Sequence, residues 1–406
     1  MQPNAHSMLL TVTTHPPQQS REDGTMTGGK QHQLSPSSWN RYEECPRKYW
    51  LSKQGLPRKA GMAASVGTAI HNSVEDLCKL DLDGRDDAET GWLPAAAKEA
   101  LDRNWEAEKE IFMATPRHPR WKEERLPKAR EGLEGSLCIL LERTRAAERS
   151  IPSVSIGAWR LVQSHVLETE SNLVSDCGRL IGRLDLLLTE EDENGEARWI
   201  VADLKTVKPP EDSLDEKVDR QLRFYRDLLK QNKPDHPPVQ AEGWYSADQT
   251  VHMTDGPPIL DSAIAAWERM TPTQEPLVAT PSEMACAFCD WKAWCPSWWV
   301  ARMEGDLLPQ GSFSDEVGRL VRLDVESGAA LFERTPPVGQ DGELSGSSHR
   351  FGALLSDGAL DSIREIHESG SDGPLFLGSA MVSSSTMRLG HWSEVIPWTP
   401  LLKSSR

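Results

Sequence analysis

Two short apolar segments, each with one carboxylate inside it, constrain the fold of this chain more than any other feature. Leu180–Leu188 contains Asp185, and Trp199–Lys205 contains Asp203. Segments of this length and composition are typical of β-strands, and Asp192–Gly195 between them is typical of a hairpin turn. A carboxylate within an apolar strand is unfavourable unless it is paired or bound to a cation. The sequence therefore predicts two neighbouring strands whose acidic groups have a basic or metallic partner.

The surrounding pattern predicts a mixed α/β (α+β) core. Helical spacing of apolar residues is found over Leu34–Gly55, Ala63–Leu80, Pro94–Ser150 and Leu214–Gln231. Two more strands are expected over Trp159–Glu168 and Gln240–Ser246. The order along the chain is then helix, three-strand meander, helix and strand, with the long stretch before residue 150 as a helical insertion.

The length of 406 residues predicts more than one domain. Residues 1–33 are rich in Pro, Gln, Thr, Gly and Ser and are expected to be disordered. Residues 34–304 are expected to form the main domain. Residues 310–400 are expected to form a small β domain, for which an OB-like barrel is one candidate. Because Met303–Ser314 has the composition of a linker, a chain ending near Glu304 is expected to fold by itself.

Charge and hydropathy narrow the class of protein. The net charge of −17 argues against indiscriminate nucleic-acid binding, but Arg41–Lys59 is locally basic and could line a groove. No apolar run approaches the roughly 20 residues that cross a membrane, and no secretory signal is visible. Seven cysteines at uneven spacing predict a metal site in a reducing cytoplasm rather than a disulfide scaffold.

Asp203 and Lys205 form the first chemical motif. Two positions apart on a strand, their side chains share one face. A carboxylate can hold a divalent cation, while an ammonium group can position an attacking water or offset charge on a phosphoryl transition state. Standing alone, such a pair is more often a solvated surface pair.

The helical pairs His71 with Glu75 and Gln221 with Tyr225 are equally ambiguous, because each is more often structural.

Three cysteines within ten residues form the second motif. Cys286, Cys289 and Cys295 leave a four-coordinate site one ligand short, and Cys45, which also precedes a proline, is the best fourth. Four thiolates suit zinc or an iron–sulfur cluster. Zinc sites more often use paired Cys-x2-Cys knuckles, and no second pair is present here, so zinc is the less favoured of the two. The other three cysteines are expected in apolar surroundings: Cys78, Cys138 and Cys177.

Taken in order, these motifs resemble the RecB/AddB-like branch of the PD-(D/E)XK nucleases, over about residues 34–300. The resemblance is carried by Cys45-Pro46 with Tyr49, Gly67 with His71, Gly182-Arg183 with Asp185, Asp203 with Lys205-Thr206, Gln221 with Tyr225, and Cys286, Cys289 and Cys295. One departure is Leu204, where many members carry an aromatic residue. That side chain is expected on the opposite face of the strand.

The resemblance implies a restriction-endonuclease-like core and a metal-dependent deoxyribonuclease. It implies that Mg²⁺ or Mn²⁺ binds at His71, Asp185 and Asp203. It implies that Lys205 is catalytic and that Gln221 and Tyr225 support the site. The thiols of Cys45, Cys286, Cys289 and Cys295 would hold a 4Fe–4S cluster. Glu168, in the preceding predicted strand, is a weaker further candidate.

The expected substrate is DNA, with an exonuclease acting on ends or single strands as the favoured form. Recombination, repair and phage DNA processing are the expected settings. No Gly-x4-Gly-Lys-Ser/Thr loop is present, so any helicase would be a separate partner. Two rival interpretations stay open: a catalytically idle DNA-binding or scaffold subunit of a helicase–nuclease complex, and a zinc-binding interaction protein.

Overall fold

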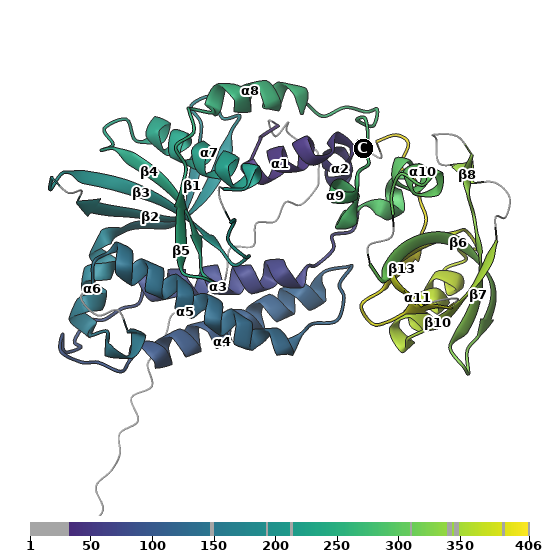
Figure 1. Ribbon diagram of the computed structural model, residues 1–406, viewed down its shortest axis with the longest axis horizontal. Helices are drawn as coiled ribbons and strands as arrows, with labels where there is room; N and C mark the ends of the chain where they lie inside the picture. Colours follow the sequence, from purple (N-terminus) through teal and green to yellow (C-terminus); the bar gives the residue numbers. More distant parts are fainter. Residues whose placement is uncertain are drawn as a thin grey trace, which may run out of the picture. The chain divides into compact units, whose positions relative to one another are not determined.

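The computed structural model describes residues 32–146, 150–191, 194–211, 214–308, 311–338, 343–344, 349–383 and 386–404. The predicted disordered segment lies outside these residues, except for its last two positions. So do residues 192 and 193 of the predicted hairpin turn. Two β-sheets organise the described chain, one of five strands and one of six (Figure 1). No described helix is long and apolar enough to span a bilayer.

The first sheet has the order β1-β2-β3-β4-β5. Its strands are β1 (Val166–Val174), β2 (Ile181–Glu191), β3 (Ala197–Lys205), β4 (Val239–Tyr245) and β5 (Thr250–Met253). The first three form an antiparallel meander, whereas β3 and β4 are parallel and are joined through α7 (Glu216–Asn232). This arrangement confirms the predicted mixed α/β class.

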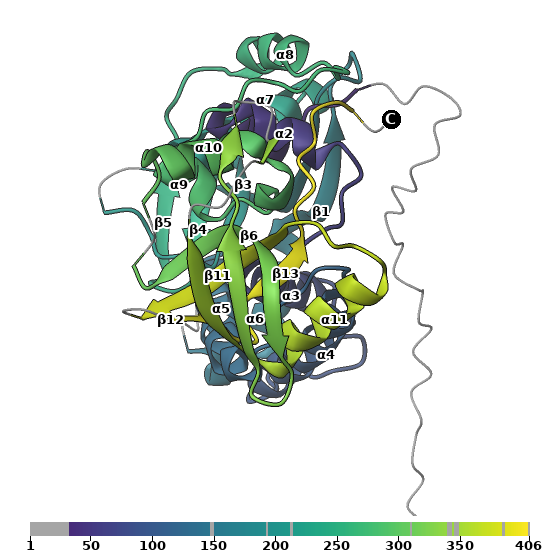
Figure 2. The same cartoon turned by 90° about the vertical axis from the view of Figure 1, so that its right-hand side faces the viewer.

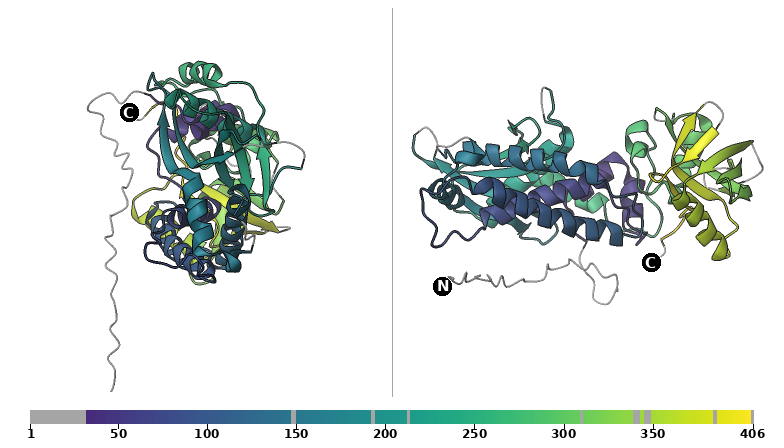
Figure 3. Two further views of the ribbon diagram at one scale, coloured as in Figure 1. Left: turned by 90° about the vertical axis from the view of Figure 1, so that its left-hand side faces the viewer. Right: turned by 90° about the horizontal axis from the view of Figure 1, so that it is seen from below.

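Helices cover both faces of this sheet (Figures 1 and 3). One layer contains α3 (Met62–Cys78), α4 (Leu93–Ala114), α5 (Leu126–Arg143) and α6 (Ile156–His165). The other contains α1 (Pro36–Glu44), α7 and α8 (Leu260–Arg269). Leu186 and Leu188 pack into the first layer, and Leu184 and Leu187 into the second. Because both faces are covered there, the middle of β2 from Leu184 to Leu188 is apolar except for Asp185.

The predicted strand Trp159–Glu168 is wrong. Most of it belongs to α6, and β1 begins only at Val166. The Ser155 side chain accepts a hydrogen bond from the Ala158 backbone N–H, which is the geometry of a helix N-cap. Ile156, Trp159 and Val162 are all buried, so the apolar positions recur every three residues, as on a helix face.

The predicted single helix Leu34–Gly55 is two helices, α1 and α2 (Pro46–Ser52), which meet at Cys45. Cys45 has φ −165° and ψ 114° because the following Pro46 disfavours helical backbone in the residue before it. Ser35 caps α1 through its contact with Ser38, and Pro36 occupies the first helical position. Because Cys45 is extended, its side chain belongs to the face of neither helix.

The second sheet closes on itself. β6, β7, β10, β12 and β11 pair in that order, and β11 returns to β6 (Figure 2). The pairs are antiparallel except β10 with β12, and α11 follows the third strand along the chain. The strands are β6 (Phe313–Asp324), β7 (Ala329–Arg334), β10 (Arg350–Leu355), β11 (Leu375–Ser383) and β12 (Thr386–Leu389). The remaining elements of this region are β8 (Pro337–Val338), β9 (Glu343–Leu344), α11 (Asp357–Glu368) and β13 (Glu394–Pro397).

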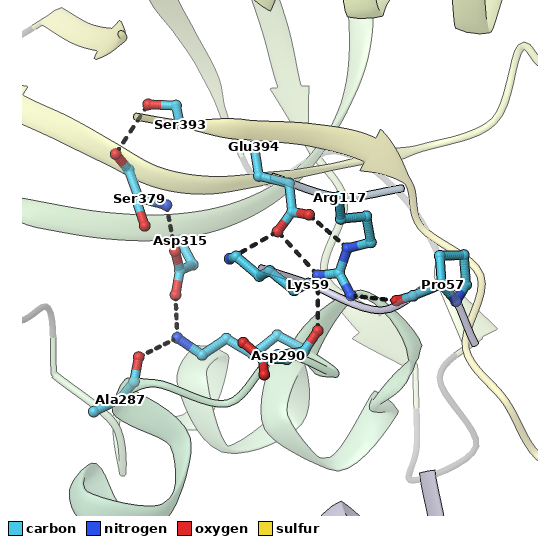
Figure 4. A network of polar contacts seen from close by, with 10 residues as sticks. Pro57, Lys59, Arg117, Ala287, Asp290, Asp315, Ser379, Ser393 and Glu394 are labelled. Carbon is cyan, nitrogen blue, oxygen red and sulfur yellow. Dashed lines mark hydrogen bonds and ion pairs between the residues drawn. The ribbon is translucent and has the colours of Figure 1, made fainter. Parts of the chain in front are cut away.

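A buried ion cluster joins this barrel to the helical layer (Figure 4). The Glu394 carboxylate on β13 accepts hydrogen bonds from Arg117 and Lys59. Arg117 also donates to the backbone oxygens of Pro57 and Asp290. Burial alone would raise the pKa of Glu394, but Arg117 and Lys59 hold it below its ordinary value. This carboxylate is therefore charged at neutral pH and is matched by two cations.

The cysteine segment contacts the barrel as well. Its elements are α9 (Glu283–Ala287), a 3-10 turn over Lys292–Trp294 and α10 (Pro296–Glu304). Lys292 forms an ion pair with Asp315 of β6, and Trp298 packs against Phe376 and Trp398. After β13 the chain runs back over this segment, where the Thr399 and Leu401 N–H groups donate to the Ala293 and Trp294 carbonyls. The boundary near residue 304 stays a prediction, but one apolar cluster crosses it.

Candidate active site

The two strand carboxylates lie on neighbouring strands, as the sequence predicts. Asp185 on β2 accepts a hydrogen bond of 2.8 Å from the Leu204 backbone N–H on β3. Helix α3 places His71 beside them, with Nδ1 at 3.5 Å from Asp185 Oδ2 and Nε2 at 3.1 Å from the Leu204 carbonyl oxygen. Ala69, Ile70 and Val74 anchor that helix in the core, which directs His71 toward the sheet.

Glu170 on β1 completes the group and is the residue that the sequence analysis missed. Ligand atoms of His71, Glu170 and Asp185 all lie within 4.8 Å of one another, the spacing of a metal-binding group. Glu170 has φ 49°, a left-handed conformation that costs a non-glycine residue about 1–3 kcal/mol and is concentrated at functional sites. Glu168, the predicted candidate, instead forms an ion pair with Lys233.

The electrostatics of this group show why a cation would be favoured. Burial lowers the pKa of His71, but its hydrogen bond to Asp185 and the nearby carboxylates raise it to about 9. Burial and the charge of Asp185 raise the pKa of Glu170 to about 7, although Arg183 forms an ion pair with it. Arg183, two residues before Asp185 on β2, therefore pairs with Glu170 on the neighbouring strand.

Asp203, Lys205, Gln221 and Tyr225 form one connected polar chain. Lys205 forms an ion pair with Asp203 and donates a hydrogen bond of 3.1 Å to Gln221 Oε1. Gln221 donates to Asp203 Oδ1 at 2.9 Å and to the Tyr225 hydroxyl at 3.1 Å. Burial raises the pKa of Asp203, and Lys205 opposes that rise. Asp203 is 2% exposed, and among its described neighbours the Oδ2 atom has only the Lys205 ion contact.

Gly182 explains how Tyr225 reaches this chain. A Cβ atom at Gly182 would lie only 3.0 Å from the Tyr225 ring, so a larger residue would push the ring away. Gln221 and Tyr225 are one turn apart on α7, whose apolar face is held in the core by Leu222, Leu228 and Leu229. Leu204 packs into the layer that contains α3, the face opposite to α7, as predicted.

Three cations of the basic stretch Arg41–Lys59 have partners within the fold, whereas Lys53 and Arg58 lie on exposed positions, so a groove along this stretch stays a prediction. Arg47 donates to the Leu277 and Leu401 carbonyls, and Lys48 pairs with Glu44. Lys59 is part of the Glu394 ion cluster. Arg47 and Lys59 link segments that lie far apart in the sequence, whereas Lys48 pairs within one turn of chain.

The four predicted cysteines line one cavity, together with Lys48, Leu51, Pro281 and Trp298. Cys45 and Cys295 have the same local structure, since each is extended and precedes a proline that begins a helix. Burial raises the pKa of Cys289 to about 11 and that of Cys295 to about 12. Such thiols ionise at neutral pH only when a cation replaces the proton.

The remaining cysteines differ from one another. Cys78 is buried and Cys138 is half-buried in the helical layer, as predicted for core residues. Cys177 is exposed, so its prediction as a core residue is wrong. Cys177 follows β1 in the short turn to β2, where a side chain faces solvent.

Comparison with known proteins agrees with this geometry. No curated protein matches the chain significantly. The model of the PD-(D/E)XK nuclease superfamily matches residues 33–296, which include every site residue described above. Members of that superfamily are typically phosphodiester hydrolases that use divalent metals. With its carboxylates on adjacent strands and a lysine two positions after the second, the chain belongs to the PD-(D/E)XK nuclease superfamily.

Proposed function

We propose that the protein is a divalent-cation-dependent deoxyribonuclease of the RecB/AddB-like type, which hydrolyses DNA from ends or in single strands. DNA recombination, repair or phage DNA processing would be its setting, and a separate helicase would supply any unwinding. The convergence of His71, Glu170 and Asp185 from three elements carries the proposal. A carboxylate with a purely structural role needs only one basic side chain to balance its charge. This group instead has ligand atoms from three residues close enough together to bind one metal ion, beside the buried Lys205.

The chain's own residues divide the chemical work. His71, Glu170 and Asp185 would hold Mg²⁺ or Mn²⁺, with Asp203 as the further carboxylate on the next strand. When bound, the cation polarises a phosphoryl oxygen and lowers the pKa of a bound water. Asp203 and Gln221 hold the Lys205 ammonium in place, so its positive charge stands ready for the negative charge that develops on the phosphoryl oxygens.

End-labelled DNA tests the proposal directly. Protein purified without oxygen should cleave single-stranded or end-containing DNA with Mg²⁺ or Mn²⁺, and excess EDTA should abolish the activity. Products resolved on a denaturing gel distinguish release of short ends from internal cuts. Binding of DNA without cleavage under any divalent cation would instead support an idle scaffold subunit.

Metal binding tests the site apart from turnover. Glu170→Gln removes one ligand charge and should weaken Mn²⁺ binding in calorimetry by about tenfold or more, the range seen when groups that support a metal are lost. Glu168→Gln is the matched control, because it lies two residues away on the same strand and pairs with Lys233. Equal Mn²⁺ affinity in both variants would remove Glu170 from the metal group.

We further propose that Cys45, Cys286, Cys289 and Cys295 hold a 4Fe–4S cluster, with zinc as the alternative. Tetrahedral zinc at Zn–S bonds of about 2.3 Å needs sulfur atoms roughly 3.8 Å apart. Zinc sites more often use two Cys-x2-Cys pairs, and this sequence has only one, Cys286 with Cys289. The arrangement of one distant and three clustered thiols supports the iron–sulfur cluster over one zinc ion. The buried shell of Trp294, Trp298 and Trp299 would keep water from the sulfurs.

Cys45→Ser tests the cluster. The native protein should be brown, with broad absorbance near about 400 nm and about four irons per chain, as is typical of such clusters. Cys45→Ser should bleach it as fully as Cys289→Ser. Cys177→Ser is the control because Cys177 is exposed and outside the cavity. Zinc without iron in metal analysis, or full colour in the Cys45 variant, would overturn the cluster.

We also propose that the C-terminal barrel is of the OB type. Three observations support this: five strands close the barrel, the third and fifth strands are parallel, and the helix α11 lies between the third and fourth strands. The barrel would then be a ligand-binding module beside the nuclease core.

A further inference from the structure

The acidic and basic residues of the C-terminal barrel lie on different parts of its surface, although the segment is acidic on average. Residues 310–400 contain thirteen acidic residues and six arginines. Four of the acidic residues lie on exposed positions of α11, and a fifth follows it: Asp357, Asp361, Glu365, Glu368 and Asp372. Four of the six arginines lie instead on exposed positions of the strands: Arg319, Arg322, Arg350 and Arg388. The barrel therefore has a basic region on its strands, although residues 310–400 have a negative net charge.

Strand register places these arginines on one face. Arg319 on β6 is opposite Glu333 on β7, which is opposite Arg350 on β10. Each set of residues directly opposite one another on adjacent strands forms a row across the sheet. In the next row on the same face, Arg322 is opposite Leu331. Residues directly opposite on paired strands share a face, and so do residues two apart on one strand. The inward positions between them, such as Phe332 and Ala353, are buried in the barrel core.

The third row adds Arg388. Ala329 on β7 is opposite Leu354 on β10, which is opposite Arg388 on β12. A register shift between Leu320 and Arg322 leaves Val321 exposed as well. The arginine face is defined as Arg319, Arg322, Arg350 and Arg388 with the exposed apolar residues Val321 and Leu354. It spans four adjacent strands, or roughly 14 Å at about 4.8 Å per strand spacing.

These arginines are mostly available to a ligand. Only Arg350 has an ion pair in the part of the chain that the structure describes, to Glu333 at 3.3 Å, and its side chain remains 60% exposed. The same face carries two carboxylates, Glu333 between Arg319 and Arg350 and Asp324 two residues from Arg322, so four arginines leave it with a net charge of +2. In a protein of net charge −17, such a basic surface indicates binding of an anionic polymer. The face contrasts with Arg47, Lys48 and Lys59 of the basic stretch, which have partners within the fold.

We propose that the arginine face binds single-stranded DNA. Arginines can contact successive phosphates, and the exposed Val321 and Leu354 between them can contact unpaired bases, which duplex DNA keeps stacked inside. Gly352 lies between Arg350 and Leu354 on the same face and leaves a shallow strip where a base can approach the sheet. The site is distinct from the carboxylate group, so it goes beyond the proposed cleavage. Its substrate class rests on that proposal.

The binding test needs no cleavage. A fluorescein-labelled 30-nucleotide oligothymidylate is titrated with full-length protein in EDTA, and anisotropy gives the dissociation constant at several salt concentrations. The variant R319A/R322A/R388A should bind at least tenfold more weakly. Its slope of log affinity against log salt should fall by about 2, at about 0.7 per lost phosphate contact on a single strand.

The control removes the same number of exposed arginines elsewhere. R103A/R269A/R364A changes net charge equally, with all three residues exposed and outside the arginine face. It should bind within twofold of the native protein. Thermal melting confirms that both triple variants fold, as expected for exposed positions.

Two results would overturn the proposal. One is equal weakening and equal salt slopes in the two triple variants, since binding would then depend on net charge alone. The other is a duplex of the same length that binds more tightly than the single strand and loses more affinity in R319A/R322A/R388A. An inactive nuclease whose oligothymidylate binding still depends on the arginine face would remove the proposed cleavage and leave this inference standing.

Discussion

Lys205→Ala is expected to reduce DNA cleavage by about a thousandfold while changing DNA affinity little. The Lys205 ammonium is held by Asp203 and Gln221 and contributes charge where the transition state gains it. Loss of one such preorganised group typically costs about 10²–10³ in turnover, or roughly 3–4 kcal/mol. Rates on end-labelled DNA and binding by anisotropy measure the two effects separately. Asp203→Asn should behave in the same way.

Lys208→Ala is the matched control. It is the same residue type three positions further along, its side chain is 80% exposed, and its ion pair among the described residues is with Glu211 at 3.9 Å. Its turnover should stay within about twofold of native. Near-native cleavage by Lys205→Ala would remove the active-site assignment. A parallel loss of melting temperature would show a structural role instead.

Ending the chain after Glu304 is expected to give a protein that aggregates and lacks its cluster. This result is the opposite of the outcome that the linker-like composition favoured. Removal of the barrel leaves Trp298 without Phe376 and Trp398, and it leaves Arg117 without Glu394. A buried cation without its partner costs about 3–5 kcal/mol, and each exposed large apolar side chain about 1.5–3 kcal/mol. Together these losses approach the whole stability of a typical domain, about 5–15 kcal/mol.

A point variant keeps this prediction testable in the full-length chain. Glu394→Gln should lower the free energy of unfolding by about 3 kcal/mol in urea, because Arg117 and Lys59 lose their shared carboxylate. Asp102→Asn, whose partner Lys98 is 65% exposed, should cost no more than about 1 kcal/mol. A soluble, coloured fragment ending at Glu304, with an unchanged melting temperature, would show that the barrel is a separate unit.

The site could be predicted from the sequence where its residues stand at fixed local spacing. Asp203 with Lys205 and Gln221 with Tyr225 are pairs whose shared face follows from strand or helix geometry alone. His71 lies beside Asp185 in the structure, as the family resemblance implied. The four cysteines line one cavity, although they come from segments about 240 residues apart.

Other features depended on tertiary geometry that no local pattern reveals. Strict alternation places Glu168 and Glu170 on one face, so it could not tell which of the two joins the metal group; the left-handed backbone at Glu170 and the ion pair of Glu168 with Lys233 distinguish them only in the structure. The helical start at Ser155 competed with an equally apolar strand pattern. The arginines of the arginine face come from four strands that are far apart in the sequence, and the segment is acidic on average. Their grouping therefore cannot be recognised from the sequence.

The position of Cys45 also sets an order of events during synthesis. Cys45 leaves the ribosome about 240 residues before Cys286, which at about 5–20 residues per second is roughly 10–50 s. Cys295, the last of the four thiols, follows nine residues after Cys286. The four-thiol pocket therefore cannot form during this interval, because three of its thiols have not yet been made. The proposed cluster would require that the Cys45 thiol stay reduced and unoccupied over the interval, so iron and sulfur could be delivered only after Cys295 has been made.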